Sequence, residues 1–125
     1  MLADKLSDND DLYHFFFLDQ LTDDLDYLTL RVDLNEGRFL KIRFGRHECY
    51  RVVDESDAYL TLHDLYALNV GYSHIYKVTD GDFFNEYHKM TEGIRKDLEL
   101  NHYIVLLDDH VIDIIGFDDP IVGLE

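Results

Sequence analysis

Apolar and polar residues alternate with a period of two in two neighbouring segments, residues 27–35 and 38–44. Alternation of this kind places the apolar side chains on one face of a half-buried β-strand. The turn signal Asn35-Glu36-Gly37 separates the two segments, and Gly45-Arg46 separates the second from a third apolar segment at 48–53. Short turns between consecutive strands predict an antiparallel meander of three strands. The alternating apolar residues of the first two segments are Leu28, Leu30, Val32, Leu34, Leu40, Ile42 and Phe44.

Helical spacing of apolar residues follows in two later segments. Ser56-Asp57 is typical of a helix start, and apolar residues then recur at helical spacing until residues 69–71, where the helix is expected to end. A second helix is expected to begin at the polar run 79–82 and to end near Gly93. The segment 12–21 is ambiguous, and the spacing of its apolar residues favours a short helix.

Three further segments predict strands. Residues 72–78 form one, and residues 102–107 and 110–115, which are rich in β-branched residues and joined at Asp108-Asp109, form a final hairpin. The resulting order predicts an α+β fold, an antiparallel sheet of about five to six strands with two or three helices packed on one face. No linker rich in Pro, Gly or Ser divides the chain, so residues 1–125 are expected to form a single domain.

The composition favours a folded protein of a reducing compartment. Hydrophobic residues make up 46% of the chain, with 9 Tyr and 8 Phe, which is enough apolar material to offset the entropy lost on ordering. Cys49 is the only cysteine, so an internal disulfide is excluded. The acidic N-terminus lacks the features of a signal peptide, and no apolar run is long enough to cross a membrane. We therefore expect a soluble cytoplasmic protein.

The formal net charge of −16 restricts the partners of the chain. Such a charge repels nucleic acids and anionic membranes, and it accelerates encounter with basic proteins. The acids are concentrated at both ends: residues 1–36 contain ten, and residues 97–125 contain eight with no Lys or Arg. Residues 31–51 carry six of the eleven basic residues. Acidity that serves solubility alone is the competing explanation.

No motif predicts catalysis, a cofactor or a metal site. The chain has no glycine-rich phosphate loop, no zinc-ligand spacing and no nucleophile elbow. His47 and Cys49 share one face of the expected strand, but free cysteines are more often small core residues. The hairpin tip with Asp108, Asp109 and His110 has donors that suit a divalent metal, but turns recruit aspartate for backbone reasons alone. Asp113 interrupts an apolar run and is expected on an outward face. We expect a protein that is not an enzyme.

The size, the aspartate-rich ends and the abundant tyrosines together resemble the small acidic immunity proteins that bacteria keep beside nuclease toxins. The resemblance is one of type and rests on no motif. It implies a protein that neutralises a basic partner, with carboxylates in place of the phosphates of a nucleic acid.

The residues expected to contact such a partner follow from charge and exposure. Charge complementarity would raise the rate of association. Aromatic residues left over from the core, at the N-terminal end, would dock the partner or a second copy of the chain. The expected contact residues are Asp23, Asp24, Asp26, Asp108, Asp109, Asp118, Asp119, Tyr13 and Phe17.

Two alternatives remain open from the sequence. The first is an enzyme or a domain that binds a small anionic ligand on the solvated face of the sheet, through bidentate contacts from basic residues. Those residues are Arg31, Lys41, Arg43 and Arg51. The second is a structural or regulatory subunit that functions only in a complex.

Overall fold

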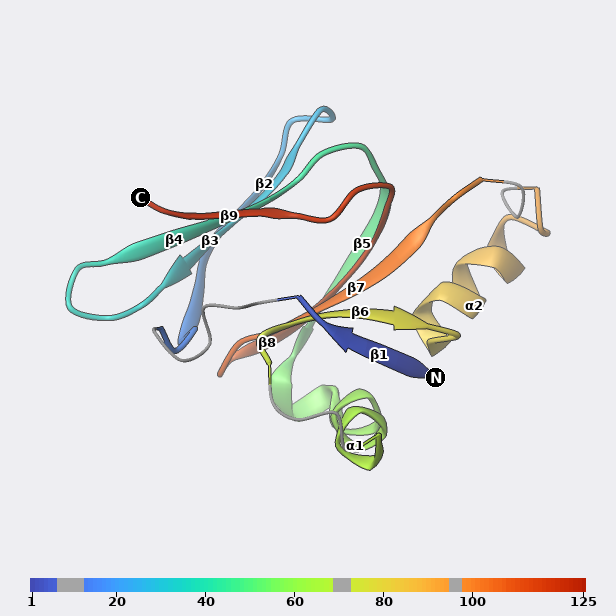
Figure 1. The fold of residues 1–125 in the computed structure, drawn as a ribbon, viewed down its shortest axis with the longest axis horizontal. Helices are drawn as coiled ribbons and strands as arrows, with labels where there is room; N and C mark the ends of the chain where they lie inside the picture. Colours follow the sequence, from blue (N-terminus) through green and yellow to red (C-terminus); the bar gives the residue numbers. More distant parts are fainter. Residues whose placement is uncertain (7–12, 69–72, 95–97) are drawn as a thin grey trace.

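Two antiparallel β-sheets pack face to face in the computed structural model of the chain, which describes residues 1–6, 13–68, 73–94 and 98–125 (Figure 1). One sheet has four strands and the other has five. Two α-helices in the described residues follow strands of the five-stranded sheet. Figure 1 shows the helix α1 (Tyr59–Ala67) on the side of the five-stranded sheet that faces away from the four-stranded sheet. The architecture is therefore a β-sandwich with a helical layer outside one of its sheets.

The four-stranded sheet contains the clearest alternating segments. In spatial order its strands are β2 (Phe17–Asp23), β3 (Leu28–Asp33), β4 (Phe39–Phe44) and β9 (Ile121–Leu124). Every second residue of β3 and of β4 is buried, as the period of two predicts. The buried face points at the other sheet, and the opposite face carries the charged side chains of Arg31, Lys41 and Arg43.

The five-stranded sheet lies in the middle of the molecule. In spatial order its strands are β1 (Leu2–Lys5), β6 (Ile75–Thr79), β7 (Asn101–Leu106), β8 (His110–Gly116) and β5 (His47–Asp54). All residues of β7 and β8 after the first of each strand are buried. A strand buried on both faces has a continuous apolar sequence rather than an alternating one. The predicted hairpin of 102–107 with 110–115 is confirmed, with Leu106 opposite Val111.

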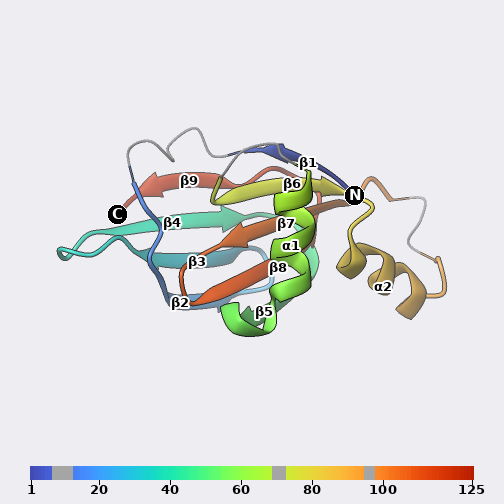
Figure 2. The same cartoon turned by 90° about the horizontal axis from the view of Figure 1, so that it is seen from below.

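Each face of the five-stranded sheet borders its own core. The core between the sheets joins Leu30, Val32 and Ile42 to Tyr103 and Ile112, together with Phe15 from the segment before β2. The second core lies on the outer face, where Ala58, Leu62 and Leu65 of the α1 region pack against β6, β7 and β8. Figure 2 shows α1 crossing these strands, while α2 (Asp82–Met90) extends past the end of the sheet.

The prediction of a single α+β sheet is wrong, because the chain forms two sheets and is mostly β. The expected meander breaks after β4. Instead of pairing with β4, β5 crosses to the other sheet at Gly45-Arg46 and pairs with β8, and β9 takes the place beside β4. The physical reason lies in β7 and β8, whose two apolar faces need a cover on each side. One sheet with helices on one face would leave the other apolar face exposed.

The predicted helix over 12–21 is also wrong for the residues that the structure describes. Residue 12 lies outside the described part, residues 13–16 are not helical, and Phe17 begins β2. The strand β2 pairs with β3, with Phe17 opposite Asp33 at one end and Asp23 opposite Leu28 at the other, and this pairing overrides the helical spacing. A bulge between Leu18 and Gln20 shifts the register of the pairing. The expected helix end at 69–71 and the first residue of the strand predicted at 72–78 fall outside the described residues.

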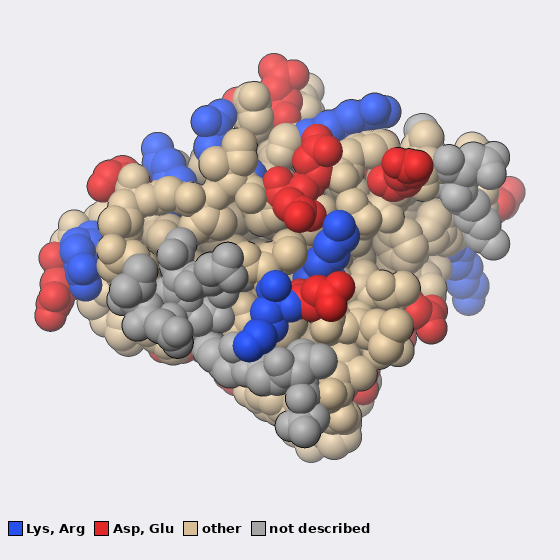
Figure 3. Space-filling view, in the orientation of Figure 1, with Lys and Arg blue, Asp and Glu red and all other residues tan. Residues whose placement is uncertain are grey.

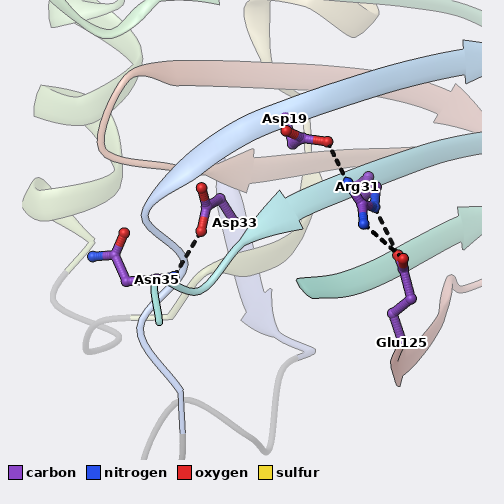
Figure 4. A network of polar contacts seen from close by, with 5 residues as sticks. All are labelled: Asp19, Arg31, Asp33, Asn35 and Glu125. Carbon is purple, nitrogen blue, oxygen red and sulfur yellow. Dashed lines mark hydrogen bonds and ion pairs between the residues drawn. The ribbon is translucent and has the colours of Figure 1, made fainter. Parts of the chain in front are cut away.

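Arg31 connects three segments of the four-stranded sheet (Figure 4). Its Nη1 donates to Asp19 on β2 at 2.7 Å, and its Nε and Nη2 both donate to the carboxylate of Glu125 at 2.7 Å. The guanidinium also lies 3.6 Å from the centroid of the Phe39 ring. A bidentate pair of this kind fixes geometry as well as charge. Arg31 therefore holds the end of the edge strand β9 against the sheet.

The pH dependence of this contact follows from the carboxylate. The hydrogen bond from Arg31 lowers the pKa of Glu125 below its usual value. Because the folded pKa is the lower one, the contact stabilises the fold fully above the ordinary pKa of glutamate and is lost as the pH falls through the lowered value. We expect the protection of β9 amides in hydrogen exchange to decrease in acid, and Glu125→Gln to remove most of that dependence. Glu36→Gln, whose carboxylate lies 4.0 Å from Arg38, is the control. Equal pH dependence in both variants would contradict this role.

Candidate functional site

Three of the aspartates expected to contact a partner meet at one end of the four-stranded sheet. The turn between β2 and β3 supplies Asp26, and the connection between β8 and β9 supplies Asp118 and Asp119. Together they line a shallow groove of about 590 Å³, which we call the turn groove. Its other walls are Tyr27, Arg43, Gly45, Arg46 and Ile121. Asp23 is the last residue of β2, and Asp24 follows it in the same β2–β3 turn.

Aspartate side chains hold the β2–β3 turn in shape. Asp23 accepts a hydrogen bond from the Leu25 amide at 2.9 Å, and Asp24 accepts from the amides of Asp26 at 3.0 Å and Tyr27 at 2.7 Å. Leu25 adopts a φ of 76°, in the left-handed region that costs a residue with a Cβ about 1 kcal/mol or more. Its side chain is 87% exposed. Backbone strain of this kind clusters at functional sites.

Apolar side chains lie among the charges of this end. Leu25 and Ile121 are largely exposed, and Tyr27 is partly exposed with the Arg43 guanidinium 4.2 Å from its ring centroid. Arg46 stacks on Phe117 in the same way, at 4.1 Å. An apolar centre with a charged rim is the usual anatomy of a protein interface. The exposed apolar residues were not predicted from the sequence, where only the charges of this region were singled out.

Hydrogen bonds position one wall of the turn groove. Asp119 accepts from the Tyr103 hydroxyl at 2.8 Å and lies 3.4 Å from the Lys77 ammonium. Burial, followed by the hydrogen bond to Asp119, raises the pKa of Tyr103 above its usual value. The tyrosine therefore stays a hydrogen-bond donor throughout the physiological range, and Asp119 keeps its orientation.

The remaining predicted contact residues lie at the opposite end of the strands. Asp108 pairs with His14 at 2.7 Å, and Asp109 accepts from the Leu18 amide at 3.2 Å. Both therefore tie the N-terminal segment to the β7–β8 turn, away from the turn groove. Phe17 is 44% exposed, whereas Tyr13 is partly buried against the core. The predicted set is thus split between two ends of the molecule.

Acidic and basic side chains lie interspersed on the face seen in Figure 3, rather than in two separate fields. The basic residues proposed to hold an anion do not form one site. Arg31 already has two carboxylate partners, Arg43 lies over Tyr27, and Lys41 is opposite Arg31 in the ladder. Arg51 is on β5, in the other sheet. A shared anion site for these four residues has no support from their positions.

A buried polar cluster lies on the outer face of the five-stranded sheet. His102 Nε2 is 2.7 Å from Asp113 Oδ1, and Arg51 Nη2 donates to Asp113 Oδ2 at 3.0 Å. His102 and Asp113 are each 2% exposed. Arg51 also lies 3.7 Å from Glu86 and stacks on Phe83. Asp113 therefore lies on the outer face of its sheet, as predicted, but the side chains that cover this face bury it.

The sequence contained a signal for this pair. A hairpin that turns at Asp108-Asp109 places His102 and Asp113 on one face and diagonally across the two strands, since Ile104 is opposite Asp113. A histidine and an aspartate within two apolar runs can avoid unpaired burial by pairing with each other.

Cys49 and His47 do not form a reactive pair. A bulge separates them on β5, and the ring nitrogens of His47 lie 2.7 Å from the Gly45 carbonyl and 3.0 Å from Asp23. Burial, with smaller contributions from Glu48 and Asp113, raises the pKa of the Cys49 thiol to about 11. A raised pKa is the opposite of what a nucleophilic cysteine needs.

Within the described ranges, no group of three or more His, Cys, Asp or Glu side chains is placed to hold a metal ion. None of the described helices is both long enough and apolar enough to span a bilayer. Comparison with models of protein families, with curated proteins and with solved structures finds no match to this chain. Function is therefore inferred from the charge and geometry of its own residues.

Removing Asp113 tests the energetic role of the buried cluster. Asp113→Ala leaves His102 and Arg51 without their carboxylate, and we expect it to lower the free energy of unfolding by about 3 kcal/mol or more. Asp113→Asn keeps the shape and one acceptor and should cost less. Asp118→Ala, at an exposed position, should change the free energy by no more than about 0.5 kcal/mol. Denaturant unfolding of the three variants measures the differences; equal stability of Asp113→Ala and Asp118→Ala would contradict the role of the cluster.

Proposed function

We propose that the chain is a cytoplasmic binding protein that neutralises or regulates a basic protein partner, most simply a nuclease toxin. The observation that carries the proposal is the turn groove, where Asp26, Asp118 and Asp119 surround exposed apolar side chains. The net charge of −16 supports the same class of partner. The carboxylates would form ion pairs with the Lys and Arg side chains that a nuclease uses to bind the phosphates of its substrate.

The charge balance of the turn groove favours a cationic surface. Asp23, Asp24, Asp26, Asp118 and Asp119 supply five negative charges, and Arg43, Arg46 and Lys77 supply three positive charges, which leaves two negative charges in this small region. Charge complementarity of this kind acts mainly on the association rate, which can reach about 10⁸ M⁻¹s⁻¹ at low salt. Charge alone does not determine how long a complex lasts.

The exposed apolar residues would determine the lifetime of the complex. Apolar anchors near the centre of an interface usually supply most of its binding free energy, whereas charges at its rim supply less. Leu25 and Ile121 are exposed, and Ile121 lines the groove itself. The strained turn holds Leu25 in place before binding, so little entropy is lost when it docks.

A charge-matched pair of double variants tests the electrostatic contribution. Asp26→Asn with Asp118→Asn removes two charges from the turn groove, and Glu36→Gln with Glu55→Gln removes two charges from exposed positions outside it. Against a panel of basic nuclease domains, we expect the first pair to lower the association rate by about tenfold at low ionic strength and to flatten its salt dependence. The Glu36→Gln, Glu55→Gln double variant should lower the association rate much less. Stopped-flow association at several salt concentrations measures both.

Two outcomes would count against this proposal. One is a wild-type association rate that does not change with ionic strength. The other is an equal loss of rate in the two double variants, which would mean that only the overall charge matters.

Leu25→Gly separates stability from binding. Glycine has no penalty at a φ of 76°, so the free energy of unfolding should stay the same or rise by up to about 1 kcal/mol. The same change removes the apolar anchor, so the dissociation rate of the complex should increase. Thermal unfolding and surface plasmon resonance give the two quantities; a variant that is less stable and binds as tightly as wild type would show that Leu25 serves the fold alone.

A further inference from the structure

The helix α1 carries apolar side chains on the side that faces away from the sheet as well as on the side that contacts it. Figure 2 shows α1 in front of the five-stranded sheet, with one side on the strands and the other turned away from them. The side on the strands belongs to the second core. The outer side carries Tyr59, Leu60 and Tyr66, whose side chains are 71%, 70% and 67% exposed.

The exposed side chains form a continuous row along the helix. Tyr59 and Tyr66 are seven residues apart, which is about two turns, and His63 lies between them with its ring stacked on that of Tyr59, 6.1 Å between centroids. Leu60 and Ala67, also seven residues apart and exposed, lie beside this row. We call these five residues the α1 stripe.

The α1 stripe is more than the usual scatter of exposed apolar residues. Single exposed apolar side chains are normal on a protein surface, whereas a contiguous patch marks a surface that binds another molecule. Tyrosine in particular is enriched in protein interfaces. A helix that is apolar on all sides is normally buried on all sides. The outer side of α1 is therefore expected to have a cover that the described part of this chain does not supply.

The backbone of α1 favours another helix as this cover. Its amide and carbonyl groups are bonded within the helix, so an extended segment docked on it would leave its own backbone groups unpaired. A helix satisfies its own backbone, and its side-chain ridges fit between those of α1. With nine residues, α1 is about 14 Å long and can contact about two to three turns of such a helix.

Acidic residues beside the α1 stripe favour a positively charged cover. The sequence has four acids and no Lys or Arg between Arg51 and Lys77. Two of these acids, Glu55 and Asp57, lie immediately before α1 and are exposed. They form no ion pair with any residue in the described ranges. Lys or Arg side chains of a partner can therefore pair with them at the rim of the apolar stripe.

The positive groups near α1 do not cancel this charge. Arg51 is paired with Asp113 and Glu86. The amino terminus of Met1 lines a recess together with Asp64, the one charged residue of α1. That recess lies on the flank of the helix toward α2, so Met1 offsets Asp64 and leaves the two acids before α1 without a positive neighbour.

A second copy of the chain fits this surface badly. In a two-fold symmetric contact the same patch faces itself. Neither copy would have a Lys or Arg within residues 52–76 to pair with the acids of the other, and each chain carries a net charge of −16. The cover is therefore expected to come from a different protein.

We propose that the α1 stripe is a docking surface for a basic amphipathic helix of another protein. The apolar face of that helix packs on Tyr59, Leu60 and Tyr66, and its Lys or Arg side chains pair with Glu55 and Asp57. The surface lies on the outer side of the five-stranded sheet, whereas the turn groove lies at one end of the four-stranded sheet. The proposal does not depend on the function proposed above.

Three synthetic helical peptides test the chemistry of the surface. The first has Leu on one face and Lys on the other, the second has Glu in place of Lys, and the third keeps Lys but has Gln in place of Leu. In NMR of the ¹⁵N-labelled intact chain, the Leu/Lys peptide should shift the amide signals of α1 saturably. The Leu/Glu peptide should not bind, and the Gln/Lys peptide should bind at least about tenfold more weakly, because it lacks the apolar anchors.

Matched single variants test the apolar contacts. Leu60→Gln and Tyr66→Gln should each weaken binding of the Leu/Lys peptide by about tenfold. Met90→Gln is the control, because Met90 lies at the end of α2, outside the stripe, and its side chain is 71% exposed. Glutamine is a good helix former, and all three side chains are largely exposed, so the unfolding midpoints should stay close to that of the wild type.

Charge-matched double variants test the acidic rim and separate this proposal from the preceding one. Glu55→Gln with Asp57→Asn should weaken binding of the Leu/Lys peptide by about tenfold and reduce its salt dependence. Asp26→Asn with Asp118→Asn, which removes two charges from the turn groove, should leave this affinity unchanged. Peptide binding at α1 without any response to basic nuclease domains would support this surface and count only against the function proposed above.

Several results would overturn the docking surface. They are signal shifts that map to the turn groove instead of α1, equal binding of the Leu/Lys and Leu/Glu peptides, and equal losses in Leu60→Gln and Met90→Gln. Sedimentation of the chain alone gives a further test. Self-association that Tyr66→Gln abolishes would assign the α1 stripe to a second copy of the chain and refute a basic helix as its cover.

Discussion

The hairpin of β7 and β8 determines the architecture, because both of its faces are apolar and each needs a cover. The four-stranded sheet covers one face and the α1 region covers the other. Burying apolar surface is the dominant favourable contribution to folding, so a hairpin exposed on one side would forfeit much of it. One chain must therefore cover both faces of the hairpin. For this reason β5 leaves the expected meander and pairs with β8, and the chain returns as β9 beside β4.

The same constraint explains why the buried polar cluster has a defined geometry. Asp113 lies on β8, in the middle of the molecule, where an unpaired carboxylate would be very costly. Its two oxygens are engaged by His102 from β7 and Arg51 from β5, so three adjacent strands are connected through one side chain. Buried pairs of this kind add little net stability when they form, but breaking one leaves an uncompensated charge. The cluster therefore fixes the relative position of the three strands more than it strengthens the fold.

The sequence predicted the local elements better than their assembly. The strands β3 and β4 and both helices were found from the periodicity of their apolar residues, which depends on the face that each element buries. The strands β7 and β8 were found from their continuous apolar, β-branched sequences. Periodicity does not determine which strand pairs with which, and the short strands β1 and β9 carry too few residues to show a pattern. In the candidate site, charge alone identified Asp26, Asp118 and Asp119, whereas the exposure of Leu25 depends on a turn conformation that its sequence does not reveal. Asp108 and Asp109 were assigned to the same surface because sequence gives no distance between two turns.

The raised pKa of Cys49 has a consequence for the chain outside a reducing environment. With a pKa of about 11, only about one molecule in ten thousand carries a thiolate at pH 7, and the thiolate is the form that oxidants and disulfides attack. Two copies of the chain will therefore be slow to crosslink through this residue in air. Any dimer that forms quickly after the chain is purified is therefore expected to be held by non-covalent contacts.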